Sequence, residues 1–259
     1  MSPDLDPATA RALLEWQIEM GVDAALEARP VDRFALPERM PAPQRRDPAP
    51  HAAPRAEAPR DPIAAAEAAA AEAADLPALR EALGRYPHCD LRMGAQNLVF
   101  ADGRPGARVM IVGEAPGREE DRSGRPFVGQ AGKLLDRMLG AIGLARGHED
   151  AGRAVYITNV LPWRPPGNRD PEPAEVAMML PFLRRHVALA APEVLVLMGN
   201  HACNAVLGKR GITKLRGRWD EAMGLPVLPM LHPAYLLRQP HAKRQAWADL
   251  LELRARLES

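Results

Sequence analysis

Three side chains that can do chemistry each stand at or just past the end of a different apolar run. They are Glu114, Asn159 and His232. A carboxylate can orient a water molecule or offset a developing positive charge. A histidine can donate a hydrogen bond, and an amide can donate and accept at once. Taken singly, each also has an ordinary explanation as a turn carboxylate, a strand-end amide or a satisfied histidine.

A glycine-rich loop follows the apolar run that ends at Gly113, and it carries several more candidates. The loop contains a single aromatic residue, Phe127, together with four acids: Glu114, Glu119, Glu120 and Asp121. Acids and one aromatic ring on a glycine-rich loop are poorly suited to a hydrophobic core. They are well suited to a binding pocket, so we expect this loop to line one.

The apolar runs predict the elements that position these residues. Short runs of β-branched and other apolar residues predict buried strands at 109–113, 154–160, 194–199 and 225–231, and helical periodicity predicts helices between and after them. This alternation favours an α/β fold with three layers, in which helices flank a mostly parallel four-stranded sheet. The carboxyl ends of parallel strands share one edge, so the three polar side chains should converge there.

Composition limits the class of protein. The 259 residues contain no apolar run of about 20 residues, the length that a membrane span needs. The N-terminus shows no secretory signal, and two cysteines, Cys89 and Cys203, do not make a disulfide framework. We therefore expect a cytoplasmic protein in a reducing compartment.

Charge is distributed unevenly. Residues 1–88 contain 10 Lys and Arg against 15 Asp and Glu, a net charge of −5, whereas residues 89–259 contain 24 against 18, a net charge of +6. A basic catalytic half fits a polyanionic partner, although charge scatter in an arginine-rich chain explains it equally well.

Three segments are predicted. Residues 1–35 form an N-terminal helical segment, since Asp6-Pro7 reads as a helix start and an apolar stripe follows it. Residues 36–75 form a Pro/Ala-rich, flexible linker, because eight prolines fall between Leu36 and Ile63. Residues 76–259 form the catalytic domain.

Four motifs resemble those of the uracil-DNA glycosylase superfamily, most closely its family 4. They are Gly113-Glu-Ala-Pro-Gly117, Gly124-Arg-Pro-Phe-Val-Gly129, Asn159-Val with Arg164-Pro-Pro-Gly-Asn-Arg169, and His232-Pro-Ala-Tyr-Leu-Leu-Arg238. The match covers about residues 86–253. The resemblance implies a hydrolase that cuts the N-glycosidic bond of uracil in DNA and leaves an abasic site for base excision repair.

The resemblance also implies roles for single residues. Phe127 stacks on the flipped uracil, Asn159 reads its polar edge, and Gly113 and Ala115 lie beside the base. His232 faces the carbonyl next to the glycosidic nitrogen. The implied catalytic residues are Glu114, Glu120, His232 and Asn159, with the two glutamates near the sugar and its attacking water.

The implied partner is uracil-containing DNA, single- or double-stranded, bound by a monomer associated with the nucleoid. Leu236 and Leu237 suit a wedge that fills the gap left by the flipped base. Arg164, Arg169 and Arg238 suit phosphate contacts.

The chain departs from family 4 at its four-cysteine iron–sulfur cluster. By spacing, the four ligand positions fall on Tyr86, Cys89, Trp163 and Met179. A cluster requires four thiolates, so we expect no iron–sulfur cluster, no other metal and no cofactor. Apolar packing by Tyr86, Trp163 and Met179 could replace it.

Two rival functions stay open on the sequence alone. One is a protein that holds uracil-containing or abasic DNA with low turnover; multiple turnover would distinguish it from an enzyme. The other is a nucleotide or nucleoside hydrolase, which would act on free monomers.

Overall fold

The computed structural model of this chain describes residues 9, 11 and 61–258. The predicted N-terminal helical segment, and residues 36–60 of the predicted linker, lie outside the described residues apart from positions 9 and 11. No helix in the described part of the chain combines the length and apolar character that crossing a membrane requires.

A six-stranded sheet forms the centre of the described part, in the order β1-β3-β2-β4-β6-β5. The four inner strands are parallel: β3 (Val155–Asn159), β2 (Val109–Gly113), β4 (Val194–Met198) and β6 (Leu225–Met230). These are the four strands that the sequence predicts, and the α/β fold class is confirmed. Two short edge strands, β1 (Asp102–Gly103) and β5 (Asp220–Ala222), pair antiparallel and were not predicted, because neither contains an apolar run.

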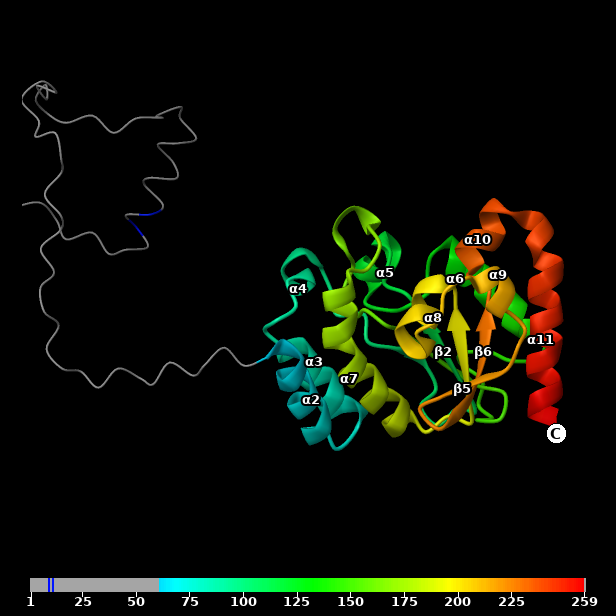
Figure 1. The fold of residues 1–259 in the computed structure, drawn as a ribbon, viewed down its shortest axis with the longest axis horizontal. Helices are drawn as coiled ribbons and strands as arrows, with labels where there is room; N and C mark the ends of the chain where they lie inside the picture. Colours follow the sequence, from blue (N-terminus) through cyan, green and yellow to red (C-terminus); the bar gives the residue numbers. More distant parts are fainter. Residues whose placement is uncertain (1–8, 10, 12–60, 259) are drawn as a thin grey trace, which may run out of the picture. The chain divides into compact units, whose positions relative to one another are not determined.

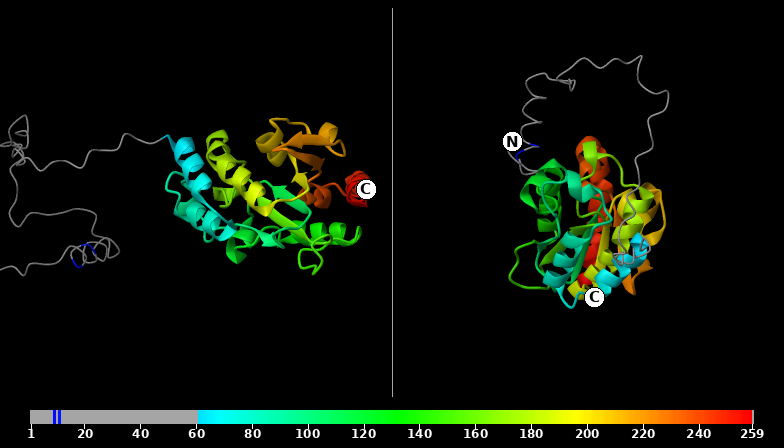
Figure 2. Two further views of the ribbon diagram at one scale, coloured as in Figure 1. Left: turned by 90° about the horizontal axis from the view of Figure 1, so that it is seen from below. Right: turned by 90° about the vertical axis from the view of Figure 1, so that its left-hand side faces the viewer.

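Helices cover both faces of the sheet (Figures 1 and 2). Alternate strand residues point to opposite faces, so each inner strand contributes to two hydrophobic cores. On β2, Met110 and Val112 join the core beneath α2 (Pro62–Glu72), α3 (Leu76–Arg85), α7 (Pro173–Ala190) and α8 (Asn200–Leu207). Val109 and Ile111 join the core beneath α6 (Gln130–Gly140) and α11 (Lys243–Glu258). Burial on both faces explains why these strands read as continuous apolar runs.

The longer helices lie where helical periodicity in the sequence predicts them, at about residues 76–84, 134–139, 175–189, 200–207 and 242–257. They are α3 (Leu76–Arg85), α6 (Gln130–Gly140), α7 (Pro173–Ala190), α8 (Asn200–Leu207) and α11 (Lys243–Glu258). Shorter helical segments were not predicted as separate elements: α4 (Leu91–Gly94), α5 (Arg118–Ser123), η1 (Pro166–Asn168), α9 (Ile212–Leu215), α10 (Pro233–Arg238) and η2 (Pro240–Ala242).

The structure contradicts the prediction of a linker for its last part. Residues 62–72 form helix α2 (Pro62–Glu72), which begins at the N-cap Asp61 and packs against α7. Ala66 and Ala70 are buried in the core beneath the sheet. The alanine-rich sequence of residues 64–74 predicts a helix that has little to bury, but the small alanine side chains let α2 approach α7 closely.

Two polar contacts fix this helix to the domain. The Tyr86 hydroxyl donates to the Pro62 carbonyl oxygen at 2.6 Å. The Arg185 guanidinium donates twice to the Ala73 carbonyl oxygen, at 2.7 and 2.9 Å. The domain boundary therefore lies at or before Asp61 rather than at Leu76.

We predict that α2 contributes measurably to stability. A chain that begins at Leu76 should melt roughly 4–8 °C below one that begins at Asp61, since it loses these hydrogen bonds, worth about 1 kcal/mol each, and its buried alanines. Thermal melts of the two chains provide the comparison. Equal melting temperatures would show that α2 is dispensable.

Candidate active site

The strand register brings the predicted site residues to one edge of the sheet. Gly113, the last residue of β2, lies opposite Asn159, the last residue of β3. The parallel hydrogen-bond pattern continues past both strands: Val160 N–H donates to the Gly113 carbonyl oxygen at 3.0 Å, and Leu161 N–H donates to that of Glu114 at 3.0 Å. Glu114 is therefore fixed beside the segment that follows Asn159.

Gly113 lies where two functional side chains meet. A Cβ atom at this position would be 2.3 Å from Asn159 Oδ1 and 2.6 Å from two ring carbons of Phe127. Any other residue would push the amide and the ring away. Ala115, which was predicted beside the base, is partly buried against the core that contains α2 and α7.

Phe127 is held in an uncommon backbone conformation. Its φ angle is +53°, in the left-handed region that a bulky side chain rarely adopts, so the surrounding structure must enforce it. Arg146 donates to the carbonyl oxygens of Pro126 and Phe127, at 2.7 and 2.6 Å. Helix α6 approaches so closely at Gly132 that a Cβ there would overlap the Phe127 carbonyl. The ring is buried, with its centre 5.4 Å from that of His232.

Glu120 supports this loop from the other side. One carboxylate oxygen accepts from the N–H groups of Val128 and Gly129, both at 2.9 Å, and the other accepts from Gly117 N–H at 3.1 Å. Both oxygens are thus engaged by backbone. The resemblance implies a catalytic role for Glu120, whereas the geometry gives it a positioning role, in which it fixes the residues after Phe127.

His232 is the N-cap of α10, at the end of β6, and its hydrogen bonding fixes its tautomer. Ala234 N–H donates to Nδ1 at 3.1 Å, so the proton of the neutral ring must be on Nε2. Loss of solvation, assisted by the positive charge of Arg238, lowers the pKa of His232 to about 4. At neutral pH the residue is therefore an uncharged ring with an available Nε2–H donor.

Glu114 is half-buried and belongs to a small group of charged side chains. Its Oε2 atom lies 3.9 Å from Nε2 of His201, which in turn lies 3.7 Å from Oδ1 of Asp170. Burial raises the pKa of Glu114, with opposite smaller contributions from His201 and Asp170. Among the described residues these three also form a group that could hold a metal ion, with ligand atoms within 4.8 Å of one another.

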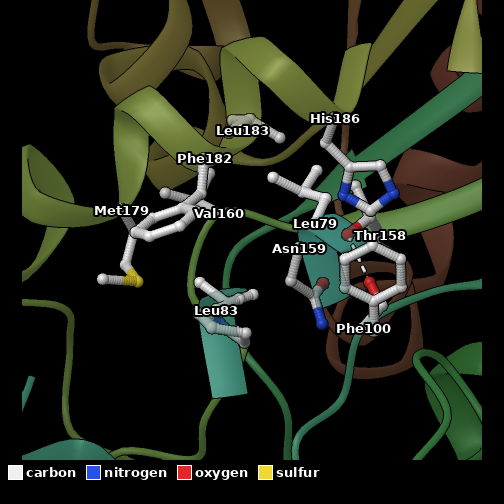
Figure 3. Close-up of a pocket in the computed structure, with 11 residues that line it drawn as sticks. Leu79, Leu83, Phe100, Thr158, Asn159, Val160, Met179, Phe182, Leu183 and His186 are labelled. Atoms are coloured by element: carbon white, nitrogen blue, oxygen red, sulfur yellow. Dashed lines mark hydrogen bonds between the residues drawn. The ribbon is translucent and has the colours of Figure 1, made fainter. Parts of the chain in front are cut away.

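A small cavity of about 20 Å³ lies behind Asn159 (Figure 3). Its wall includes Thr158 and His186. The Thr158 hydroxyl donates to the Phe100 carbonyl oxygen at 2.7 Å. The His186 ring stacks on that of Phe100, with ring centres 4.3 Å apart. His186 shares a 3.0 Å hydrogen bond with the Tyr156 hydroxyl, and burial lowers its pKa to about 4. These contacts stabilise β3 directly beneath Asn159.

The structure rules out one of the two residues of the predicted wedge and leaves the other as a prediction. Leu236 is fully buried in a core with Leu134 and Leu231, so it cannot enter DNA. Leu237, the next residue on α10, is 42% exposed, and Arg238 follows it at the surface. A wedge in this structure therefore consists of Leu237 alone.

The structure also reduces the set of arginines predicted to contact phosphate. Arg169 is bound to Glu175 through two hydrogen bonds, at 2.5 and 3.0 Å, with Glu172 a further 3.2 Å away. This arginine therefore anchors the start of α7 and is not free for phosphate. Arg164 donates to Asn168 Oδ1 at 2.7 Å and remains a candidate with Arg238.

The iron–sulfur positions contain packed side chains that do not suit a cluster. Tyr86, Cys89, Trp163 and Met179 are all at most 3% exposed and belong to the same core. Tyr86 packs edge-on against Phe182, with ring centres 5.3 Å apart, and burial raises the pKa of the Cys89 thiol. One protonated thiol among three non-thiolate side chains is the wrong donor set for a cluster that needs four thiolates.

Sequence reasoning missed three residues of this site. Arg146 lies in a loop between predicted elements, and nothing in its surroundings indicates that it reaches Phe127. His201 and Asp170 are isolated polar residues at helix and loop positions. Only the fold brings them to Glu114.

Comparison with known proteins identifies relatives over most of the described region. Residues 100–251 match the model of the Uracil DNA glycosylase superfamily. The chain is 40% identical to a type-4 uracil-DNA glycosylase of Sulfurisphaera tokodaii over 64% of this chain and 77% of that protein. Identity is 44% to the type-4 enzyme of Thermotoga maritima, over 58% and 77%, and 40% to that of Archaeoglobus fulgidus, over 64% and 84%.

We predict that Glu120→Gln mainly costs stability. The amide has one acceptor oxygen in place of two, so at least one buried N–H group loses its partner, at a cost of roughly 1–3 kcal/mol. Denaturant unfolding should show this loss. An unchanged free energy of unfolding would show that Glu120 does not hold the loop.

A second prediction concerns iron. The purified protein should be colourless, with no visible absorbance in the iron–sulfur region, because three of four ligand positions carry non-ligands. Iron should be measured after anaerobic preparation. An iron content of about four atoms per chain would contradict the prediction that no cluster is bound.

Proposed function

The chain belongs to the uracil-DNA glycosylase superfamily, and we propose that it excises uracil from DNA with the residues gathered at the end of the parallel sheet. The observation that carries this assignment of roles is the meeting of Asn159, Phe127 and Gly113 within van der Waals reach, with His232 next to Phe127. An aromatic face, an amide and a hydrogen-bond donor are the groups needed to bind a uracil and to assist its departure.

The proposed reaction is hydrolysis of the bond between uracil N1 and the sugar C1′. As this bond breaks, its electron pair moves onto the base, and the sugar becomes cationic. Water then adds to C1′ and releases a proton, which leaves an abasic site and free uracil. Groups that stabilise the anionic base or the cationic sugar lower the barrier because these charges exist mainly in the transition state.

His232 stabilises the leaving base in this scheme. Its Nε2–H donates to the uracil carbonyl next to N1, where negative charge develops. The ring is neutral at physiological pH, so it stabilises the charge by donating a hydrogen bond rather than a proton. Preorganised donors of this kind typically contribute about 10²–10³ in rate.

Asn159 and Phe127 select the base. The amide can donate to the uracil carbonyl remote from the sugar and accept from the ring N–H, a pattern that cytosine does not match. The Phe127 ring supplies a stacking face. Because Glu120 and Arg146 fix its loop, this face is preorganised before DNA arrives.

Glu114 supports the sugar side of the reaction. It directly follows Gly113, the residue at which Asn159 and Phe127 meet. Ionised, it can orient the attacking water and offset the positive charge of the sugar. Its half-buried position makes this charge more effective than it would be in bulk water.

The base must leave the duplex to reach these groups, at a cost of a few kcal/mol. Leu237 is placed to occupy the vacated space, and Arg238 and Arg164 to hold the backbone phosphates. The net charge of +6 over residues 89–259 favours the approach of DNA.

A uracil-containing oligonucleotide tests the function directly. Incubation followed by alkali should break the strand at uracil, with multiple turnovers per enzyme. His232→Ala should lower the single-turnover rate roughly 10²-fold or more and leave DNA binding almost intact. The matched control is His148→Ala. His148 precedes β3, at the amino end of the strand and away from the site, so this variant should keep the wild-type rate. A folded His232→Ala protein with the wild-type rate would remove His232 from the mechanism.

The two neighbouring leucines of α10 provide a second test. Leu237→Ala should leave the melting temperature unchanged and slow excision from double-stranded more than from single-stranded DNA, since only the duplex leaves a gap to fill. Leu236→Ala should instead lower the free energy of unfolding by roughly 2–5 kcal/mol. Equal effects of Leu237→Ala on both kinds of DNA would exclude the wedge.

A further inference from the structure

We propose that His201 and Asp170 act as positioning residues that set the ionisation of Glu114 and thereby the lower end of the pH range for uracil excision. This inference rests on the proposed function. Neither residue belongs to the motifs that carry the family resemblance, and both approach Glu114 only through the fold.

The geometry groups two carboxylates and one histidine, with their nearest side-chain ligand atoms all within 4.8 Å of one another. His201 is the second residue of α8, and its Nε2 atom lies 3.9 Å from Oε2 of Glu114. Asp170 lies in the loop before α7, and its Oδ1 atom is 3.7 Å from the same nitrogen. The three side chains come from three separate elements.

The two neighbours act on Glu114 in opposite directions. A positive charge nearby favours the ionised carboxylate, and a negative charge disfavours it. His201 accordingly lowers the pKa of Glu114 and Asp170 raises it, while burial, the largest effect, raises it as well.

Other charged groups near the site bear on a different residue. Glu120 and Arg238 affect His232, and so does His201. Within the described part of the chain, His201 and Asp170 are the charged groups that shift the pKa of Glu114. Asp170→Asn should therefore report on Glu114, whereas His201→Gln also removes a charge that lowers the pKa of His232, so the opposite shift in Asp170→Asn is the decisive result.

The sign of each effect follows from the reaction. Excision needs Glu114 ionised, so kcat/KM should fall as pH falls through the pKa of Glu114. His201→Gln removes the cation, which raises this pKa and moves the acidic limb of the pH profile to higher pH. Asp170→Asn removes the anion, which lowers the pKa and moves the same limb to lower pH.

The experiment measures kcat/KM against pH for the full chain and its variants on a uracil-containing oligonucleotide. We expect the acidic limbs of His201→Gln and Asp170→Asn to move in opposite directions from the wild type. His201→Lys, which restores a cation, should move the limb back toward the wild-type position. Added salt should bring the acidic limbs of the two variants closer together in pH, because salt screens half-exposed charges.

Two residues in the loop before β3, at the amino end of that strand, provide matched controls. His148→Gln and Glu149→Gln make the same kinds of charge change far from Glu114, and both should keep the wild-type limb. Parallel melts separate an effect on ionisation from an effect on folding, since a merely structural role would lower rates at all pH values alike.

The possible failures can be told apart. If the wild-type protein does not excise uracil, the proposed function falls. If it excises uracil but the limb stays in place in both variants, or moves the same way in both, the inference alone is overturned. Loss of activity on chelation, restored by a divalent metal, would also overturn it, because the three side chains would then be metal ligands.

Discussion

The parallel register of the four inner strands is the constraint on which the rest of the site depends. It places Gly113 opposite Asn159, and Met198 opposite Met230, so that the chain leaves each strand at the same level. The backbone hydrogen bonds that follow, from Val160 to Gly113 and from Leu161 to Glu114, carry this alignment into the loops. A slip of one residue would turn the side chain of Asn159 to the other face of the sheet.

The loop that carries Phe127 depends on a second set of contacts, because its backbone conformation is unfavourable by itself. Glu120 binds the N–H groups after Phe127, and Arg146 binds the carbonyl groups at and before it. These two side chains hold the ring from either side, where a flat base can stack under the proposed function. Under the proposed function this ring is preorganised, and preorganisation is the condition under which fixed groups accelerate a reaction most.

Much of this arrangement could be predicted from the sequence, because it depends on local patterns. The inner strands are buried on both faces and read as apolar runs, and their polar ends identify Glu114, Asn159 and His232. The remaining features depend on tertiary contacts. How α10 packs decides whether Leu236 or Leu237 faces the core. The fold alone shows that the carboxylates of Glu175 and Glu172 engage Arg169. The packing of helix α2 on the domain was missed because the pattern of an alanine-rich helix former without a strong apolar stripe indicates little surface to bury.

The central claim is that His232 presents a neutral Nε2–H donor to the leaving base, and nitrogen NMR of labelled protein tests it most directly. The nitrogen shifts of this ring should show a neutral Nε2–H tautomer at pH 7, and the ring should gain a proton only near the lowered pKa of about 4. Its Nδ1 should carry the signature of an acceptor from Ala234 N–H. A ring that is protonated at neutral pH, or that carries its proton on Nδ1, would contradict this account of the site.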